Sequence, residues 1–144
     1  MKLLESVADV LNASRSADRP LGLVPTMGAL HAGHISLVRR AIADNRSVVV
    51  SIFVNPAQFD SEEDVENYPM EISRDVSMLE AEGVDIIFAP SPREMYSEGF
   101  DTRVIVGRIA DRLEGKYRPN HFTGVTTIVA KLLNIVEPEK AYFG

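Results

Sequence analysis

The residues with the clearest capacity for chemistry lie in one segment, which reads PTMGALHAGH over residues 25–34. It joins a short apolar run, residues 21–24, to a stretch with helical periodicity. The first turn of a helix offers unpaired N–H groups and a positive dipole end, and both favour phosphate. Gly28 and Gly33 have no Cβ atoms and would let a nucleotide approach the backbone closely. The segment therefore predicts a phosphate site at a strand-to-helix turn.

Two histidines of this segment, His31 and His34, are three positions apart, so both rings would face one ligand on a single helical turn. An imidazole donates a hydrogen bond to a phosphate oxygen and, when protonated, neutralises developing charge. Such a pair could assist nucleotidyl transfer without a covalent intermediate. One alternative is a structural glycine turn that happens to carry histidines. Another is a zinc pair, for which only His121 remains as a third histidine and no cysteine exists.

A second polar segment follows the run SVVVSIFV at residues 47–54, the clearest strand pattern in the chain. Asn55 and Gln58 each offer a hydrogen-bond donor and an acceptor, which suits recognition of a small hydroxylated acid. The alternative is an ordinary turn, because Asn-Pro is a common turn starter.

A third segment, residues 115–124, leads into an apolar helical pattern. Lys116 and Arg118 could bind phosphate or carboxylate, with the arginine in bidentate fashion. Gly124 would allow close approach at a second helix start. The alternative is a solvated basic loop in which His121 is satisfied locally.

The elements expected to position these segments alternate between strand and helix patterns. We expect strands at residues 21–24, 47–54, 84–89, 102–106 and 140–143, and helices at residues 3–11, 35–45, 70–82 and 125–136. The acidic stretch 60–67 is interpreted as a solvated loop. Continuous apolar strands separated by helices indicate an α/β fold with a mostly parallel sheet covered on both faces. Ligands in such sheets bind outside the carboxyl ends of the strands, near the switch in strand order.

Composition narrows the function classes. The chain has 144 residues, enough for about one domain, with 15 Lys and Arg against 21 Asp and Glu and a net charge of −6. This balance gives no overall attraction to nucleic acid or to an anionic membrane. The absence of cysteine excludes disulfides, thiolate catalysis and Cys-ligated metals. No apolar run approaches the roughly 20 residues of a membrane span, and Glu5 and Asp9 argue against a signal peptide.

Taken together, these segments resemble the pantothenate synthetase family. The similarity rests on residues 25–34, residues 53–59, the Arg118-Pro119 and His121-Phe122 pairs, and the closing run KLLNIV at residues 131–136. It implies a Rossmann-like nucleotidyltransferase domain of the HIGH superfamily, in which residues 31–34 are the local version of the motif.

The resemblance also implies a reaction. Pantoate and ATP with Mg²⁺ would form pantoyl adenylate and pyrophosphate, and β-alanine would then displace AMP to give pantothenate. The family implies a cytoplasmic homodimer. Residues 1–144 would be the ATP- and pantoate-binding domain, and the family's C-terminal lid domain is absent from this sequence, so we expect little activity from the chain alone. Alternatives are another nucleotidyltransferase of the same superfamily and a non-catalytic nucleotide-binding or dimerisation module.

By motif position, the resemblance assigns catalysis to His34 and His31, with His34 donating a hydrogen bond to developing negative charge. It assigns ATP binding to Met27, Gly28, Ala29, Leu30, His31, Ala32, Gly33, His34 and Gly144. It assigns pantoate or β-alanine binding to Gln58, Asn55, Pro25, Thr26, Met27, Ile128, Val129 and Arg118. It assigns no residue to a resident metal ion.

Overall fold

The computed structural model describes residues 1–59, 61–69 and 71–144, and in these ranges parallel strands form one five-stranded sheet. The strands are β1 (Lys2–Leu4), β2 (Leu21–Thr26), β3 (Ser47–Ile52), β4 (Ile86–Phe88) and β5 (Lys140–Ala141). Their order across the sheet is β1-β4-β3-β2-β5, and every neighbouring pair is parallel. The predicted α/β class with a parallel sheet is confirmed.

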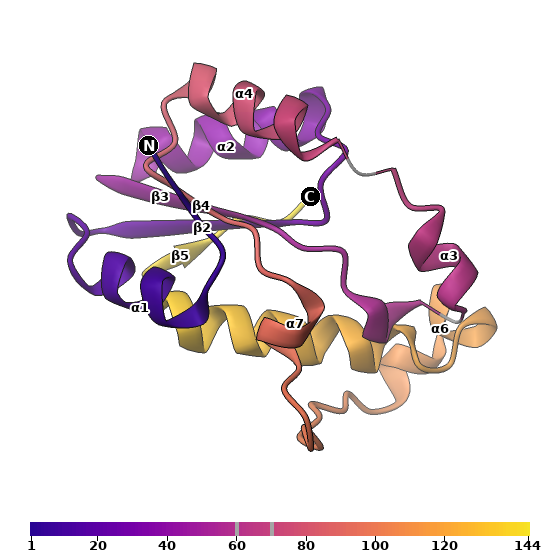
Figure 1. Cartoon of the computed structure of the whole chain (residues 1–144). Coiled ribbons are helices and arrows are strands. Elements are labelled where there is room, and N and C mark those ends of the chain that lie inside the picture. The colour runs from indigo at the N-terminus through magenta and orange to yellow at the C-terminus, as the bar shows by residue number, and fades with distance from the viewer. Residues whose placement is uncertain (60, 70) are drawn as a thin grey trace.

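Helices cover both faces of the sheet (Figure 1). One face is covered by α1 (Val7–Arg15) and α7 (His121–Val136), and the other by α2 (Ala32–Asp44) and α4 (Ile72–Glu82). Alternate β3 residues enter the two cores: Val49 packs with α1 and α7, while Val48 and Val50 pack with α2 and α4. Because both faces are covered, all six residues of β3 are buried, and four of them are Val or Ile.

Short elements occupy the longer connections. They are the 3₁₀ turns η1 (Pro56–Gln58) and η2 (Arg108–Asp111) and the short helices α3 (Glu62–Glu66), α5 (Pro92–Met95) and α6 (Glu114–Tyr117). Most of them lie beyond the carboxyl ends of the strands (Figure 1). None of the helices in the described ranges has the length and apolar character needed to cross a membrane.

The strand order places a switch point at β2. From β2 the chain moves to β3 and β4 on one side, whereas β5 pairs with β2 on the other side. The connection from β2 to β3 runs toward one edge of the sheet, and the connection from β4 through α7 to β5 runs toward the other, which opens a crevice outside the carboxyl ends of β2 and β5. The histidine segment begins there, because β2 ends at Thr26.

Three expectations about the elements are wrong. Residues 3 and 4 lie in strand β1, paired with β4, and not in a helix. The helix begins only at Val7, where the Ser6 side chain accepts a hydrogen bond from the N–H of Asp9. The expected strand at 102–106 is irregular, because Val104 bonds the Thr127 and Thr126 hydroxyls of α7 and not a sheet edge. The expected loop at 60–67 contains helix α3, while residue 60 lies outside the described residues.

Other boundaries differ by a few residues. The expected strand 21–24 continues through Pro25, which has no N–H to donate, because β5 pairs only with Gly22 and Leu23 and leaves that side of β2 open. The expected helix 70–82 is observed from Ile72, with residue 70 outside the described residues. It ends at Gly83 in the left-handed region (φ 83°), as its sequence predicts.

Candidate active site

A cavity of about 730 Å³ lies at the switch point and brings most of the predicted site residues together. We call it the histidine cavity. Its size is in the range of small-molecule sites. Among the predicted residues, those that line it are Pro25, Thr26, Met27, His31, Gly33, His34, Asn55, Gln58, Ile128, Val129 and Gly144. They come from the ends of β2 and β3, the start of α2, η1, α7 and the segment after β5.

The two histidines cap the helix that carries them. His31 is the N-cap of α2, and its Nδ1 accepts the N–H of Gly33 at 3.1 Å. His34 Nδ1 in turn accepts the N–H of His31 at 3.4 Å, and the ring centroids are 4.1 Å apart. Since each Nδ1 is an acceptor, the neutral form of each ring carries its proton on Nε2. The caps therefore give both rings an N–H donor on the side away from the helix backbone.

Burial and the neighbouring His31 lower the pKa of His34 below its ordinary value, and the carboxylate of Asp75 opposes them. The ordinary value is about 6.5, so His34 is neutral near pH 7. The geometry therefore presents His34 as an uncharged Nε2–H donor. The sequence also suggests a protonated ring that neutralises charge. That role would require the partly buried His34 to bind a proton, which its lowered pKa disfavours.

We expect an NMR titration of His34 to show a midpoint below about 6.5 and a neutral Nε2–H tautomer at pH 7. Because the folded-state pKa is below that of the unfolded chain, this residue leaves stability unchanged above about pH 6.5 and lowers it as the pH falls through that value. Measurement of ¹⁵N shifts would check both points. A proton on Nδ1 would contradict the capping geometry, and a midpoint above 6.5 would contradict the effect assigned to burial and His31.

The amide of Gln58 is oriented by a chain of hydrogen bonds that begins at the backbone. Asn55 is 1% exposed; its Oδ1 accepts the N–H of Ala57, and its Nδ2 donates to the Gly124 carbonyl at 3.1 Å. Asn55 Nδ2 also donates to Gln58 Oε1 at 3.0 Å, which leaves the Gln58 Nε2 directed at the Met27 sulfur, 3.0 Å away. Gln58 therefore presents donors to the cavity, which suit the oxygens of a carboxylate or hydroxyl.

Two further contacts hold η1 in place. The Tyr96 hydroxyl donates to Asn55 Oδ1 at 2.7 Å, and burial raises the pKa of Tyr96 to about 12. His121 Nδ1 lies 2.9 Å from the Gln58 carbonyl oxygen and donates to it. His121 therefore anchors this turn and does not line the histidine cavity. Within the described residues, no group of three or more His, Asp or Glu could hold a metal ion, so the zinc alternative has no ligand set there.

The predicted residues outside the histidine cavity have other partners. The N–H groups of Ala29 and Leu30 bond Asp75, and Leu30 is buried in the core. Ala32 is exposed at the first position of α2. Arg118 follows α6, where its guanidinium lies 3.2 Å from Glu114 Oε1, and it is not among the cavity-lining residues. Its predicted contact with pantoate therefore has no support in this geometry.

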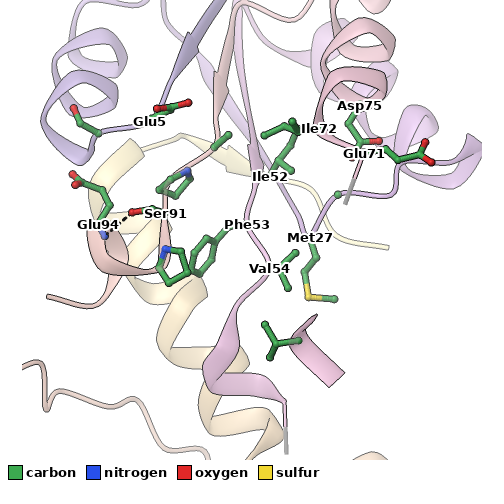
Figure 2. A pocket seen from close by; sticks show the side chains of 16 residues that line it. Glu5, Met27, Ile52, Phe53, Val54, Glu71, Ile72, Asp75, Ser91 and Glu94 are labelled. Carbon is green, nitrogen blue, oxygen red and sulfur yellow. Dashed lines mark hydrogen bonds between the residues drawn. The ribbon is translucent and has the colours of Figure 1, made fainter. Parts of the chain in front are cut away.

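Gly28 lines a neighbouring cavity of about 580 Å³ outside β3 and β4, which also shares Met27 and Phe53 with the histidine cavity. Figure 2 shows Glu5 and Glu94 on one side of it and Glu71 and Asp75 on the other. Carboxylates repel phosphate, so this acidic cavity disfavours a phosphate group that has no counterion. The histidine cavity carries no acidic lining residue in the described part of the chain and is the better candidate.

Comparison with known proteins shows which family the chain belongs to. The sequence model of the Pantoate-beta-alanine ligase family matches residues 1–144. The chain belongs to this family. It is 52% identical over 144 residues to a pantothenate synthetase of Roseiflexus castenholzii, with 100% of this chain and 52% of that protein covered. A pantothenate synthetase of Acetivibrio thermocellus is 51% identical over 147 residues, with the same shares. The chain thus spans about half the length of the curated relatives it matches.

Solved structures of pantoate–β-alanine ligases share the fold. The pantothenate synthetase of Thermus thermophilus superposes with a TM-score of 0.94 at 48% identity, covering 100% of this chain and 52% of that one. The Francisella tularensis enzyme, solved in complex with beta-gamma ATP and beta-alanine, has a TM-score of 0.93 at 41% identity, covering 98% and 55%. The resemblance to this family and to its fold is confirmed.

Several cavity residues were not assigned as site residues from the sequence. They are Ser36, Leu37, Phe53, Val125, Leu132 and Phe143. Two signals could have indicated some of them: Leu132 follows Ile128 by one helical turn, and Phe53 lies next to the end of β3. Leu37 and Phe143 have no comparable signal, because they reach the cavity only through the packing of α2 beside β5.

Proposed function

We propose that residues 1–144 form the ATP- and pantoate-binding domain of a ligase that condenses pantoate with β-alanine. The observation that supports this most directly is the histidine cavity itself: the His31 and His34 donors and the Gln58 amide face one cavity at the switch point of a parallel sheet. Phosphate and a small hydroxy acid both need donors of this kind. Because the chain belongs to the Pantoate-beta-alanine ligase family, we assign the phosphate to ATP and the hydroxy acid to pantoate.

The proposed reaction has two steps. A pantoate carboxylate oxygen attacks the α-phosphorus of ATP, the bond from that phosphorus to the bridging oxygen breaks, and pyrophosphate leaves. The β-alanine nitrogen then attacks the acyl carbon and loses a proton, and the carbon–oxygen bond to AMP breaks. Transfers at phosphorus depend mainly on positioning and electrostatics. His34 would stabilise the negative charge that develops at the phosphate through its Nε2–H, with His31 beside it.

The ATP phosphates would lie along residues 27–34 and near Gly144, as the family motif implies. Pantoate would lie between Gln58 and the apolar wall of Ile128 and Val129, with Pro25 and Thr26 at its base. Asn55 would act through Gln58, because its own amide is fully used within the protein. A closed apolar wall would also keep water from hydrolysing the mixed anhydride.

Mg²⁺ would enter with ATP as part of the co-substrate. Magnesium is commonly held by substrate phosphates with few protein ligands, and the described residues offer no cluster of three ligating side chains. Likewise, the described residues that line the histidine cavity include no Lys or Arg. We therefore expect a cation from outside residues 1–144 to pair with the phosphates, and only weak ATP binding by these residues alone. Since ATP is an intracellular metabolite, the reaction would take place in the cytoplasm.

The function is tested by AMP release from the full-length gene product supplied with ATP, Mg²⁺, pantoate and β-alanine. We expect AMP and pantothenate in equal amounts, and no sustained turnover when pantoate is omitted. Pyrophosphate release with a nucleotide or an alcohol in place of pantoate would instead indicate another nucleotidyltransferase of the superfamily. ATP binding without any release would indicate a binding module.

We also propose that the protein is a homodimer. Between α5 and α7 the chain exposes a run of apolar side chains, among them Ile105 (76% exposed), Ile109 (75%) and Leu113 (85%). A second copy would remove these side chains from water, and apolar burial drives such association. Light scattering should give a dimer for the protein and a monomer for Ile109→Asp. A wild-type monomer at micromolar concentration would contradict the proposal.

A further inference from the structure

The turn between β2 and α2 has an unusual backbone. Gly28 and Ala29 are consecutive residues with positive φ, at 86° and 51°. Glycine adopts this region freely, but a residue with a Cβ does so at a cost of roughly 1 kcal/mol or more. Such a conformation persists only where surrounding contacts determine it. Thr26 supplies one such contact, since its hydroxyl accepts the Gly28 N–H at 3.2 Å.

The larger contact comes from Asp75, which lies 46 positions beyond Ala29, in helix α4. Its Oδ2 accepts the Ala29 N–H at 2.8 Å, and its Oδ1 accepts the Leu30 N–H at 2.9 Å. Successive backbone N–H groups in a turn of this kind form an anion-binding concavity. Here a carboxylate of the protein fills that concavity, and it is only 1% exposed.

Asp75 acts at the right place to set the catalytic geometry. Leu30 precedes His31, whose ring caps α2 and whose N–H bonds the His34 ring. A shift of the Ala29–Leu30 peptide would therefore move both rings. Asp75 lines the acidic cavity, where Figure 2 shows it beside Glu71, and it is not among the residues that line the histidine cavity. It can hold the turn without contacting a ligand there.

We propose that Asp75 is a positioning residue for catalysis, which holds the Ala29–Leu30 turn so that the His31 and His34 donors meet the phosphates. This inference rests on the proposed function for its effect on rate, but not for its effect on structure. The Asp75 charge also favours a proton on His34, against the opposing effects of burial and His31. An uncharged residue at position 75 is therefore expected to lower the His34 pKa further, an effect of the charge that adds to the loss of a hydrogen bond to the turn.

The test uses Asp75→Asn in the full-length gene product. The amide keeps the shape but replaces one acceptor oxygen with an NH₂ group that faces a backbone N–H. We expect exchange of the Ala29 or Leu30 amide proton to speed up at least tenfold and the NMR midpoint of His34 to fall. The kcat of pantoate-dependent pyrophosphate release should fall about 100-fold, as for a small misplacement of catalytic groups. The KM for pantoate should change less than threefold, because Gln58 and Ile128 are held by other elements.

The matched control is Glu71→Gln. Glu71 is the exposed N-cap residue of the same helix and lines the same cavity, but its carboxylate is not one of the groups that hold the Ala29–Leu30 turn. It should stay within twofold of wild type in every readout. Asp75→Glu keeps the charge and both acceptor oxygens, so its kcat should lie between those of Asp75→Asn and the wild type. If Asp75→Asn does not fold, Asp75→Glu replaces it in the same measurements. Wild-type exchange, His34 midpoint and kcat in Asp75→Asn would overturn the proposal. If the wild type releases no pyrophosphate, the proposed function is wrong, and the amide-exchange data still show whether Asp75 holds the Ala29–Leu30 turn.

Discussion

Replacement of His34 by alanine is expected to lower pantoate-dependent pyrophosphate release by about 100- to 1000-fold in the full-length gene product. Loss of one preorganised donor to developing charge has effects of that size. The Nδ1 of the His34 ring accepts the His31 N–H, so the Nε2–H remains available to donate to a phosphate oxygen. Rapid-quench measurement of the first turnover would isolate the adenylate-forming step.

The control for His34→Ala is His34→Gln. A glutamine can place an amide N–H near the position of Nε2, so it should recover at least tenfold of the lost rate. Alanine also removes the acceptor for the His31 N–H, whereas the side-chain oxygen of a glutamine can keep this reciprocal cap. A typical cap contributes about 1 kcal/mol of stability, which thermal unfolding of both variants would measure separately from the rate. Equal rates for the two variants would mean that an N–H donor at this position does not restore catalysis. An unchanged rate in His34→Ala would remove the residue's assigned role.

Replacement of Gly124 by alanine is expected to damage both the fold and the site. Gly124 lies in the first turn of α7, and a Cβ there would overlap the Ala57 carbonyl and lie 2.6 Å from the Gln58 backbone nitrogen. Since these neighbours are backbone atoms, η1 would have to move, and Gln58 would move with it. We expect about 1–3 kcal/mol lower stability, as in other overpacked sites, and a roughly 100-fold lower kcat/KM for pantoate.

The matched control is Gly107→Ala, because nothing in the same chain lies within 4 Å of a Cβ at Gly107, and light scattering of this variant would check that the neighbouring surface of Ile105 and Ile109 still forms the proposed dimer. This change should alter stability by less than about 0.5 kcal/mol and leave the kinetics unchanged. Thermal unfolding and steady-state kinetics with varied pantoate would measure both effects. A Gly124→Ala enzyme with wild-type stability and wild-type KM for pantoate would show that α7 and η1 do not need this close approach.

Features encoded in local sequence could be predicted. The β-branched run of β3 indicates a strand buried on both faces, and Gly83 indicates the end of α4. The spacing of His31 and His34 indicates two rings on one turn, and the sheet topology implies that β2 and β3 end on the same edge. These signals were enough to place Asn55 near the histidines.

Features that depend on distant partners could not be predicted. The segment around Val104 has strand composition but bonds to α7, because a strand also needs a free edge beside it. Leu3 and Leu4 fit helical spacing as well as a short strand, and their pairing with Ile87 and Phe88 of β4, more than 80 positions away, makes them a strand. Asp75 has no local signal at all, since its partners lie 45 and 46 positions away and meet it through the packing of α4 on α2.

The most direct measurement is an isotope experiment with pantoate labelled with ¹⁸O in its carboxylate. If the carboxylate attacks the α-phosphorus at the histidine cavity and β-alanine then displaces AMP, one labelled oxygen must remain on AMP. Mass spectrometry of the products should therefore find AMP carrying a single ¹⁸O and pantothenate carrying the other in its amide carbonyl. Unlabelled AMP, or ¹⁸O in inorganic phosphate beside ADP, would contradict an acyl adenylate and the site assigned to form it.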